Sequence, residues 1–75
     1  MKIRTQDGKQ YLEFGEVYVD SQGSSGQAAV YVRNRLNPAP VCIGIYEDMS
    51  RAKGVLYEID LAYQARKKVF YAPSE

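Results

Sequence analysis

Histidine is absent from the 75-residue chain, and cysteine occurs once, at Cys42. Without histidine, the chain lacks the commonest general base and the commonest metal ligand of proteins. A single cysteine excludes an internal disulfide and suits a reducing compartment, so we expect a cytoplasmic protein. These absences argue against a zinc site and against the nucleophile–base pairs that hydrolases use.

Long apolar runs and an excess of one charge are also missing. No segment approaches the roughly 18 apolar residues of a membrane span, and the N-terminal MKIRTQDGKQ has no apolar stretch behind its charges. We therefore expect neither a membrane helix nor a signal peptide. Ten basic and nine acidic residues give a net charge of +1, which is not the basic excess typical of dedicated DNA binders. With 45% hydrophobic and 25% charged residues, the composition predicts one soluble globular domain, residues 1–75.

Short strands are predicted over most of the chain. The Gln6-Asp7-Gly8 segment separates two such strands and is typical of a tight hairpin, because glycine tolerates the positive φ of the turn. A glycine-rich loop at 20–26 and a proline-containing loop at 34–40 separate further strands. The predicted strands are 2–5, 9–14, 16–20, 27–34, 41–46 and 69–72.

Alternation within 41–46 predicts which side chains enter the core. We expect the inward-facing residues to be Val41, Ile43 and Ile45. The outward-facing residues would then be Cys42, Gly44 and Tyr46.

One amphipathic helix is predicted over residues 48–66. Apolar residues recur there at spacings of three and four, namely Met49, Ala52, Leu56, Ile59 and Tyr63. Asp48 is a suitable N-cap because its carboxylate can accept from free main-chain N–H groups. Arg66, Lys67 and Lys68 place cations near the C-terminal end, where the helix dipole favours them.

Together these elements predict an α+β fold. We expect a small antiparallel sheet of four to five strands, with one long C-terminal helix packed across it and a short last strand. The predicted core residues are apolar and face inward: Ile3, Leu12, Val17, Val19, Val30, Val32, Ile43, Ile45, Met49, Ala52, Leu56, Ile59 and Val69.

Three segments carry a resemblance: MKIRTQDGK at 1–9, GIYEDMSRAKGVLYEIDLAY at 44–63 and KVFYAPSE at 68–75. They resemble a group of small accessory proteins encoded in phages and prophages of Gram-positive bacteria. That group has a start resembling I-x-x-Q-D, a Gly-x-Tyr turn into a helix with Arg-Ala and Val-Leu-x-Glu-Ile, and a Phe-Tyr-x-Pro finish. The matching positions are Gln6, Asp7, Gly44, Tyr46, Arg51, Ala52, Val55 to Ile59, and Phe70 to Pro73.

The resemblance implies a mobile-element origin and an accessory role in the cytoplasm of a host bacterium, without specifying an activity. Small accessory phage proteins often disable host defences, anti-CRISPR proteins among them. Gly54 departs from the pattern, because the group usually has a charged or strong helix-forming residue there.

The helix face opposite the predicted core stripe is a first candidate site, because a solvated face is normally charged. Its residues are uncharged: Ser50, Gly54, Tyr57, Leu61 and Ala65. Glycine inside a helix costs about 0.8–1.0 kcal/mol relative to alanine, and a small-x-x-x-small pair such as Ser50 and Gly54 allows another backbone to approach closely. We predict an interface here, either with a second copy in a homodimer or with a target protein. The alternative is a face of intermediate polarity without a partner.

Outward-facing tyrosines on the strands form a second candidate site, and their positions are Tyr11, Tyr18, Tyr31 and Tyr46. Tyrosine is a good strand former, so β-propensity alone accounts for this pattern. With Arg33, the surface would suit a protein partner, since tyrosine and arginine are enriched at binding hot spots. With Arg33, Arg35 and Lys67, the same surface could stack nucleic-acid bases.

No residue set predicts catalysis. The serines have no histidine to activate them, and the carboxylate pairs Glu47/Asp48 and Glu58/Asp60 point in different directions. The 23–26 loop lacks the Lys-Ser/Thr of a phosphate-binding loop. We therefore expect a non-enzymatic protein, without cofactor or metal, that binds a host protein or ribonucleoprotein stoichiometrically. The alternatives are a nucleic-acid-binding module and a sponge for a nucleotide immune signal.

Overall fold

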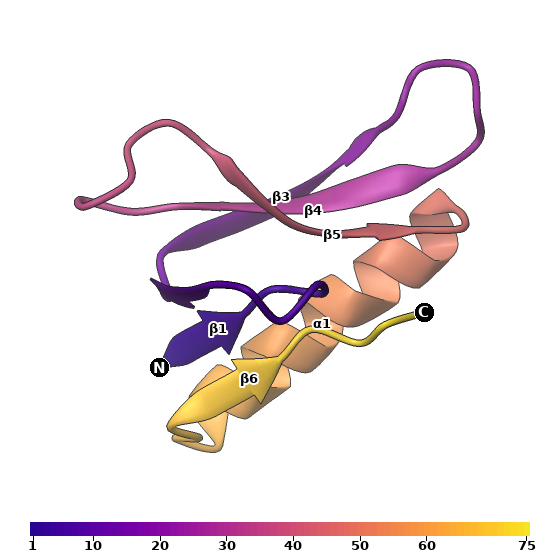
Figure 1. Ribbon diagram of the computed structural model, residues 1–75. Coiled ribbons are helices and arrows are strands. Elements are labelled where there is room, and N and C mark those ends of the chain that lie inside the picture. The colour runs from indigo at the N-terminus through magenta and orange to yellow at the C-terminus, as the bar shows by residue number, and fades with distance from the viewer.

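The computed structural model describes residues 1–75 and contains six strands and one helix (Figure 1). The strands are β1 (Lys2–Arg4), β2 (Tyr11–Glu13), β3 (Glu16–Ser21), β4 (Ala28–Arg33), β5 (Val41–Tyr46) and β6 (Val69–Tyr71), and the helix is α1 (Met49–Gln64). The strands form two three-stranded sheets, in the orders β2-β1-β6 and β3-β4-β5. The predicted α+β class, with one helix packed across the strands and a short last strand, is confirmed, and the strands are divided between two sheets.

The sheet β2-β1-β6 joins the two ends of the chain. β1 pairs antiparallel with β2 across the predicted turn, in which Gly8 has a φ of 74°. The turn is closed by Asp7 Oδ1, which accepts from Thr5 Oγ1 at 2.6 Å and from Lys9 N at 2.9 Å. Both hydrogen bonds favour the ionised carboxylate and so lower the pKa of Asp7, and the bond from Thr5 makes the larger contribution. On its other edge, β1 pairs parallel with β6, and α1 lies within the long connection that a parallel pair requires.

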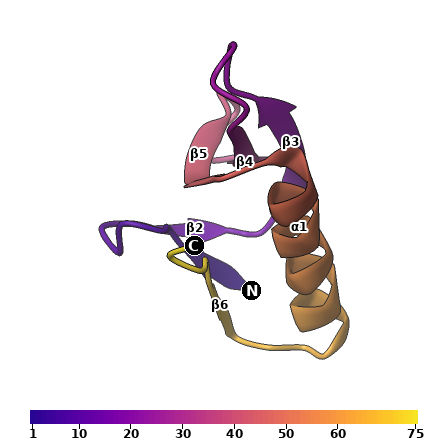
Figure 2. The same ribbon diagram turned by 90° about the vertical axis from the view of Figure 1, so that its right-hand side faces the viewer.

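The helix packs against the antiparallel sheet β3-β4-β5 through a narrow stripe. Its buried residues are Ala52, Val55 and Ile59, spaced by three and four as on one helical face. In Figure 2, α1 runs down one side of the molecule, with β3, β4 and β5 at its upper end and the other sheet across from its lower half. The core therefore lies between the helix and both sheets. No helix of the structure combines the length and the apolar character needed to cross a membrane.

The helix begins after the predicted N-cap and ends at Gln64, two residues before the predicted end, and hydrogen bonds support both of its ends. Asp48 Oδ1 accepts from Arg51 N at 2.8 Å, which confirms the N-cap. At the other end, Arg66 N donates to Tyr63 O and Lys67 N donates to Ala62 O, both at 3.0 Å. This pattern is a Schellman turn, and Arg66 occupies its left-handed position with a φ of 58°.

Most of the predicted core is confirmed. The buried members are Ile3, Leu12, Val30, Val32, Ile43, Ala52 and Ile59, and Val17, Val19 and Met49 pack against them while partly buried. Leu56 and Val69 are only half-buried. Tyr63, at the end of the predicted helical stripe, is exposed and stacks on Phe14 with ring centroids 4.3 Å apart.

The predicted orientation of Ile45 and Tyr46 is wrong. Ile45 is 43% exposed, whereas Tyr46 is 2% exposed. Val30 pairs with Gly44 and the next residue, Tyr31, pairs with Cys42, so Ile43 is an extra residue in β5. Such a bulge reverses the alternation beyond it, which turns Gly44 and Tyr46 inward. Gly44 also makes room for the tyrosine ring, because a Cβ there would lie 2.7 Å from Tyr46 Oη.

Candidate binding surface on the helix and the last strand

The uncharged helix face predicted as an interface lies on the solvent side of α1. Tyr57 is 64% exposed and Leu61 is 46% exposed, and Ser50 and Ala65 are exposed beside them. A large aromatic and a large aliphatic side chain therefore stand next to each other in solvent, one helical turn apart.

Gly54, the fifth residue of this face, is half-buried and lies beside an ion pair. The guanidinium of Arg51 contacts Glu58 Oε2 at 3.0 Å and donates to the main-chain oxygen of Glu75 at 2.9 and 2.7 Å. A Cβ added at Gly54 would meet only Arg51 Nη1, at 3.8 Å, which is ordinary van der Waals contact. No contact within the chain therefore requires glycine at this position.

A groove separates the C-terminal half of α1 from β6. It is an open groove of about 480 Å³, and six of its eight lining residues are hydrophobic. The helix contributes Glu58, Leu61, Ala62 and Ala65, and the following segment contributes Lys67, Val69, Phe70 and Tyr71. Leu61 and Ala65 thus belong both to the predicted helix face and to the groove. Sequence reasoning missed the groove, because β6 reaches this place through its parallel pairing with β1.

The strand β6 forms one end of its sheet and has β1 as its only neighbour. Lys68 O accepts from Lys2 N at 2.9 Å, and Ala72 N donates to Arg4 O at 3.0 Å. Main-chain groups of successive strand residues point to opposite edges. Val69 and Tyr71 therefore direct their N–H and C=O groups away from β1, at the free edge of the sheet.

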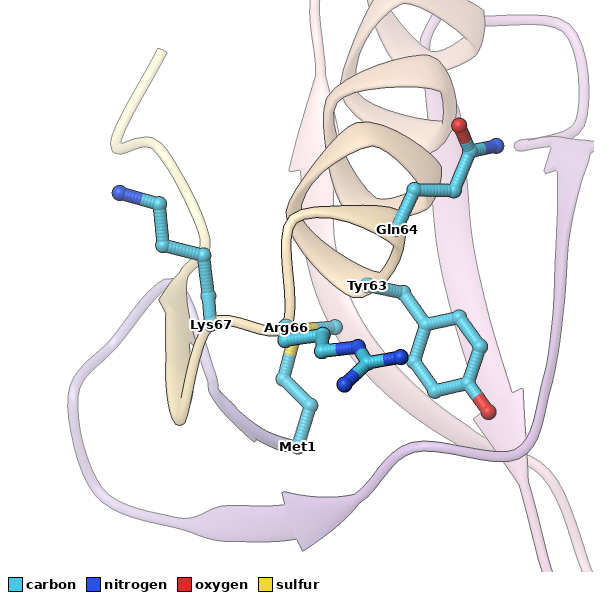
Figure 3. Close-up of a pocket in the computed structure, with 5 residues that line it drawn as sticks. All are labelled: Met1, Tyr63, Gln64, Arg66 and Lys67. Atoms are coloured by element: carbon cyan, nitrogen blue, oxygen red, sulfur yellow. The ribbon is translucent and has the colours of Figure 1, made fainter.

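Three consecutive cations follow the helix, and all three are exposed: Arg66, Lys67 and Lys68. None of them belongs to the ion pairs of the structure, which are Lys2–Glu13, Arg33–Glu16 and Arg51–Glu58. Figure 3 shows the Arg66 side chain lying beside Tyr63 and Met1, whereas Lys67 extends to the other side of the connection, toward β6. A shallow hollow of about 490 Å³ lies among these residues and Gln64. This end of the molecule therefore carries unneutralised positive charge.

The predicted tyrosine surface is divided in the structure. Tyr46 is buried in the core because of the β5 bulge, so it is not available to a partner in this fold. Tyr11 is exposed, but it lies on β2 in the other sheet, with the Arg4 guanidinium 5.7 Å from its ring. Only Tyr18 and Tyr31 remain together on the outer face of β3-β4-β5.

These two tyrosines and Arg33 are already engaged within the chain. Tyr18 and Tyr31 are cross-strand partners, are half-buried, and stack with ring centroids 5.5 Å apart. Gln22 Nε2 donates to Tyr31 Oη at 3.1 Å, and Arg33 forms an ion pair with Glu16. Arg35 lies exposed in the 34–40 loop. These contacts leave fewer free aromatic faces and cations on this surface than the sequence predicted.

Three residues of the predicted resemblance, Gln6, Tyr46 and Pro73, link the two ends of the chain. Gln6 Nε2 donates to Ile45 O and to Ser74 O, both at 3.0 Å, and Gln6 Oε1 accepts from Ile45 N at 2.9 Å. Tyr46 Oη donates to Pro73 O at 2.8 Å. The Gln-Asp start, the Gly-x-Tyr turn and the Tyr-x-Pro finish therefore meet in one hydrogen-bonded junction. In this chain, these positions have a structural explanation.

The stability of the protein is expected to fall between pH 10 and pH 12, because burial raises the pKa of Tyr46 from 10 to about 12. In that range the unfolded chain loses the tyrosine proton while the folded chain keeps it, so rising pH favours unfolding. The stabilisation from this shift is complete below pH 10 and amounts to on the order of 2 kcal/mol. Urea unfolding of wild type and Tyr46→Phe across this range measures the effect. The advantage of wild type over Tyr46→Phe at neutral pH should shrink and then reverse as pH rises, and a constant difference would contradict the shift.

Comparison of the chain with protein-family models, with curated proteins and with solved structures finds no match to any of the three.

Proposed function

We propose that this chain is a non-enzymatic, phage-type accessory protein that binds a host macromolecule stoichiometrically in the bacterial cytoplasm and thereby inhibits a host defence, as anti-CRISPR proteins do. The observation that carries the proposal is the exposed apolar surface around the groove. Tyr57, Leu61 and Tyr71 are 64%, 46% and 60% exposed. Clustered exposed side chains of this size are typical of protein-binding sites, whose hot spots are rich in tyrosine.

A protein target is favoured over nucleic acid by the state of the charged and aromatic residues. The strand residue Arg33 is paired with Glu16, and Tyr18 and Tyr31 stack on each other. Arg66, Lys67 and Lys68 form a run of three exposed cations without ion-pair partners, next to the apolar groove. Positive charge at the rim of an apolar surface suits a protein partner with acidic residues.

Affinity capture from a Gram-positive host tests the proposal. The bait is the tagged chain, and the comparison baits are the double variant Tyr57→Asp/Leu61→Asp and the matched control Ser24→Asp, in the exposed 20–26 loop. We expect wild type and Ser24→Asp to retain one host component in roughly equimolar amount, and the double variant to lose it, because a carboxylate in a desolvated interface is costly. Equal retention by all three baits would contradict the proposed surface.

The anti-defence role has its own test. Strains that each carry one defence system are challenged with a phage that the system restricts, with and without expression of the chain. We expect plating to be restored in the strain whose defence component is captured, and the Tyr57→Asp/Leu61→Asp variant to fail. Capture of a component whose defence system stays fully active would refute inhibition.

Self-association is the alternative use of the outer helix face, in which a second copy rather than the host component covers Tyr57 and Leu61. Gly54→Glu should convert a dimer to a monomer in light scattering, because its carboxylate would stand where two helices approach closely. Gly54→Ala is the matched control: it should keep the dimer and stabilise the fold by about 1 kcal/mol, since alanine is the better helix former and fits the space. A monomeric mass for wild type, or a dimer that survives Gly54→Glu, removes the homodimer from the proposal.

A further inference from the structure

We propose that the groove between α1 and β6 binds an extended acidic peptide segment of a protein partner, which adds to β6 as a new strand. The inference rests on the proposed function in one respect, namely that the partner is a protein. It specifies the part of the partner that is recognised and the main-chain groups that recognise it.

The free main-chain groups of β6 suit an extended peptide. Val69 and Tyr71 each present a main-chain N–H and C=O on the side away from β1, because Lys68 and Ala72 use theirs to pair with β1. An extended peptide satisfies these groups with the spacing of a β-ladder, which a helical partner does not. The strand β6 has only three residues, Val69–Tyr71, so its free edge suits a short recognition segment and not a long intermolecular sheet.

The lining of the groove determines the side chains that fit. Ala62 and Ala65 are small, so the helix wall leaves room beside β6, and Val69 and Phe70 are half-buried on the opposite wall. Successive side chains of a strand point to opposite faces. Alternate residues of the bound segment would therefore enter the groove and should be apolar, whereas the residues between them would face solvent.

Charge complementarity determines the sign of the bound segment. Lys67 lines the groove, and its neighbours Arg66 and Lys68 are likewise without ion-pair partners. The acidic residue of the groove, Glu58, is neutralised by Arg51 at 3.0 Å. The uncompensated charge is thus positive and lies at the end of the groove near Lys67. Aspartate or glutamate in the peptide would be favoured there.

The test is selection of random octapeptides displayed on phage against the immobilised full chain. We expect enrichment of sequences with apolar residues at alternate positions and with Asp or Glu. A synthetic peptide of the enriched sequence is then titrated by fluorescence anisotropy. Lys67→Glu should weaken its binding on the order of tenfold or more, whereas Lys53→Glu, an exposed cation on another side of α1, should leave binding within about twofold. Enrichment of basic peptides, no enrichment at all, or equal effects of the two variants would overturn the proposal.

The strand addition is tested separately from the charge. Tyr71→Pro removes the free edge N–H and should abolish binding, whereas Tyr71→Ala keeps that N–H and should weaken binding less. In the wild-type protein, which needs no substitution, peptide should slow hydrogen exchange of the Val69 and Tyr71 amides. Unchanged exchange at both amides in the complex would overturn strand addition. If these amides already exchange slowly without peptide and the mass is doubled, a second copy of the chain pairs with the edge instead.

The peptide experiment and the host capture fail independently. Selected peptides can bind the groove although no host component is retained, which would refute the proposed target and leave the groove assignment standing. Conversely, if the selected peptide does not displace a captured partner, that partner binds to another surface of the chain.

Discussion

Gly15→Ala is expected to destabilise the protein by about 3 kcal/mol or more, because the new methyl group would overlap the main chain of a neighbouring segment. A Cβ at Gly15 would lie 2.4 Å from Arg33 O, 2.8 Å from Asn34 Cβ and 3.2 Å from Asn34 Cα. Two of these three atoms belong to the main chain, so no side-chain rotation removes the overlap.

The surroundings of Gly15 leave little freedom for adjustment. Asn34 Nδ2 donates to Glu13 O at 2.8 Å, which fixes the end of β4 against the connection between β2 and β3. Glu16 pairs with Arg33 in the first register position of β3 and β4. A shift that relieves the overlap would therefore disturb the place where the two sheets join.

Urea unfolding monitored by circular dichroism measures this loss. The total stability of a domain of this size is about 4–11 kcal/mol, so Gly15→Ala should unfold at a much lower urea concentration or be unfolded without urea. Gly54→Ala is the matched control, since the same substitution on the open helix flank should raise stability. A loss smaller than about 1 kcal/mol at Gly15 would show that the close contact with Arg33 and Asn34 is absent in solution.

Tyr46→Ala is expected to cost about 3–5 kcal/mol, the range for removal of a buried aromatic side chain. Tyr46 is the largest of the fully buried side chains and belongs to the core cluster that includes Ile3, Ile43 and Ile59. Its removal would leave a cavity next to Gly44, which has no side chain to fill it. It would also remove the hydrogen bond to Pro73 O and the contact with the Arg51 guanidinium, 5.8 Å from the ring.

Tyr46→Phe separates these contributions. It keeps the ring and removes only the hydroxyl, so at neutral pH it should cost about 1 kcal/mol, the usual net value of one hydrogen bond. Thermal and urea unfolding of the two variants should therefore differ by at least about 2 kcal/mol. If both variants cost the same, burial of the ring contributes little, and the inward orientation of Tyr46 would be contradicted.

The local elements of the fold could be predicted from sequence because their signals lie within a few residues of one another. The 3.6-residue period and the Asp48 N-cap predict α1, and Gly8 predicts the first hairpin. The same period also placed Tyr57 and Leu61 on the solvent side, where they are exposed. This half of the candidate site follows from one helix alone and needs no knowledge of the other elements.

The remaining features depended on pairing between distant segments. The division of six short strands into two sheets depends on which strands pair, including the parallel pairing of β1 with β6. This pairing does not change the local alternation of side chains, so the sequence alone did not indicate the division. The extra residue of β5, Ile43, likewise depends on a distant segment, because the position of a bulge is set by the register between β5 and β4.

The sequence by itself determined that this is a small α+β domain whose helix has one apolar and one uncharged face. Only the tertiary structure decided that Tyr46 is in the core, that Arg33 is paired, and that Leu61 and Ala65 border a groove with a free strand edge. The physical reason is that side-chain period and turn residues act within a segment, whereas burial and groove shape depend on main-chain pairing of β1 with β6 and of β4 with β5.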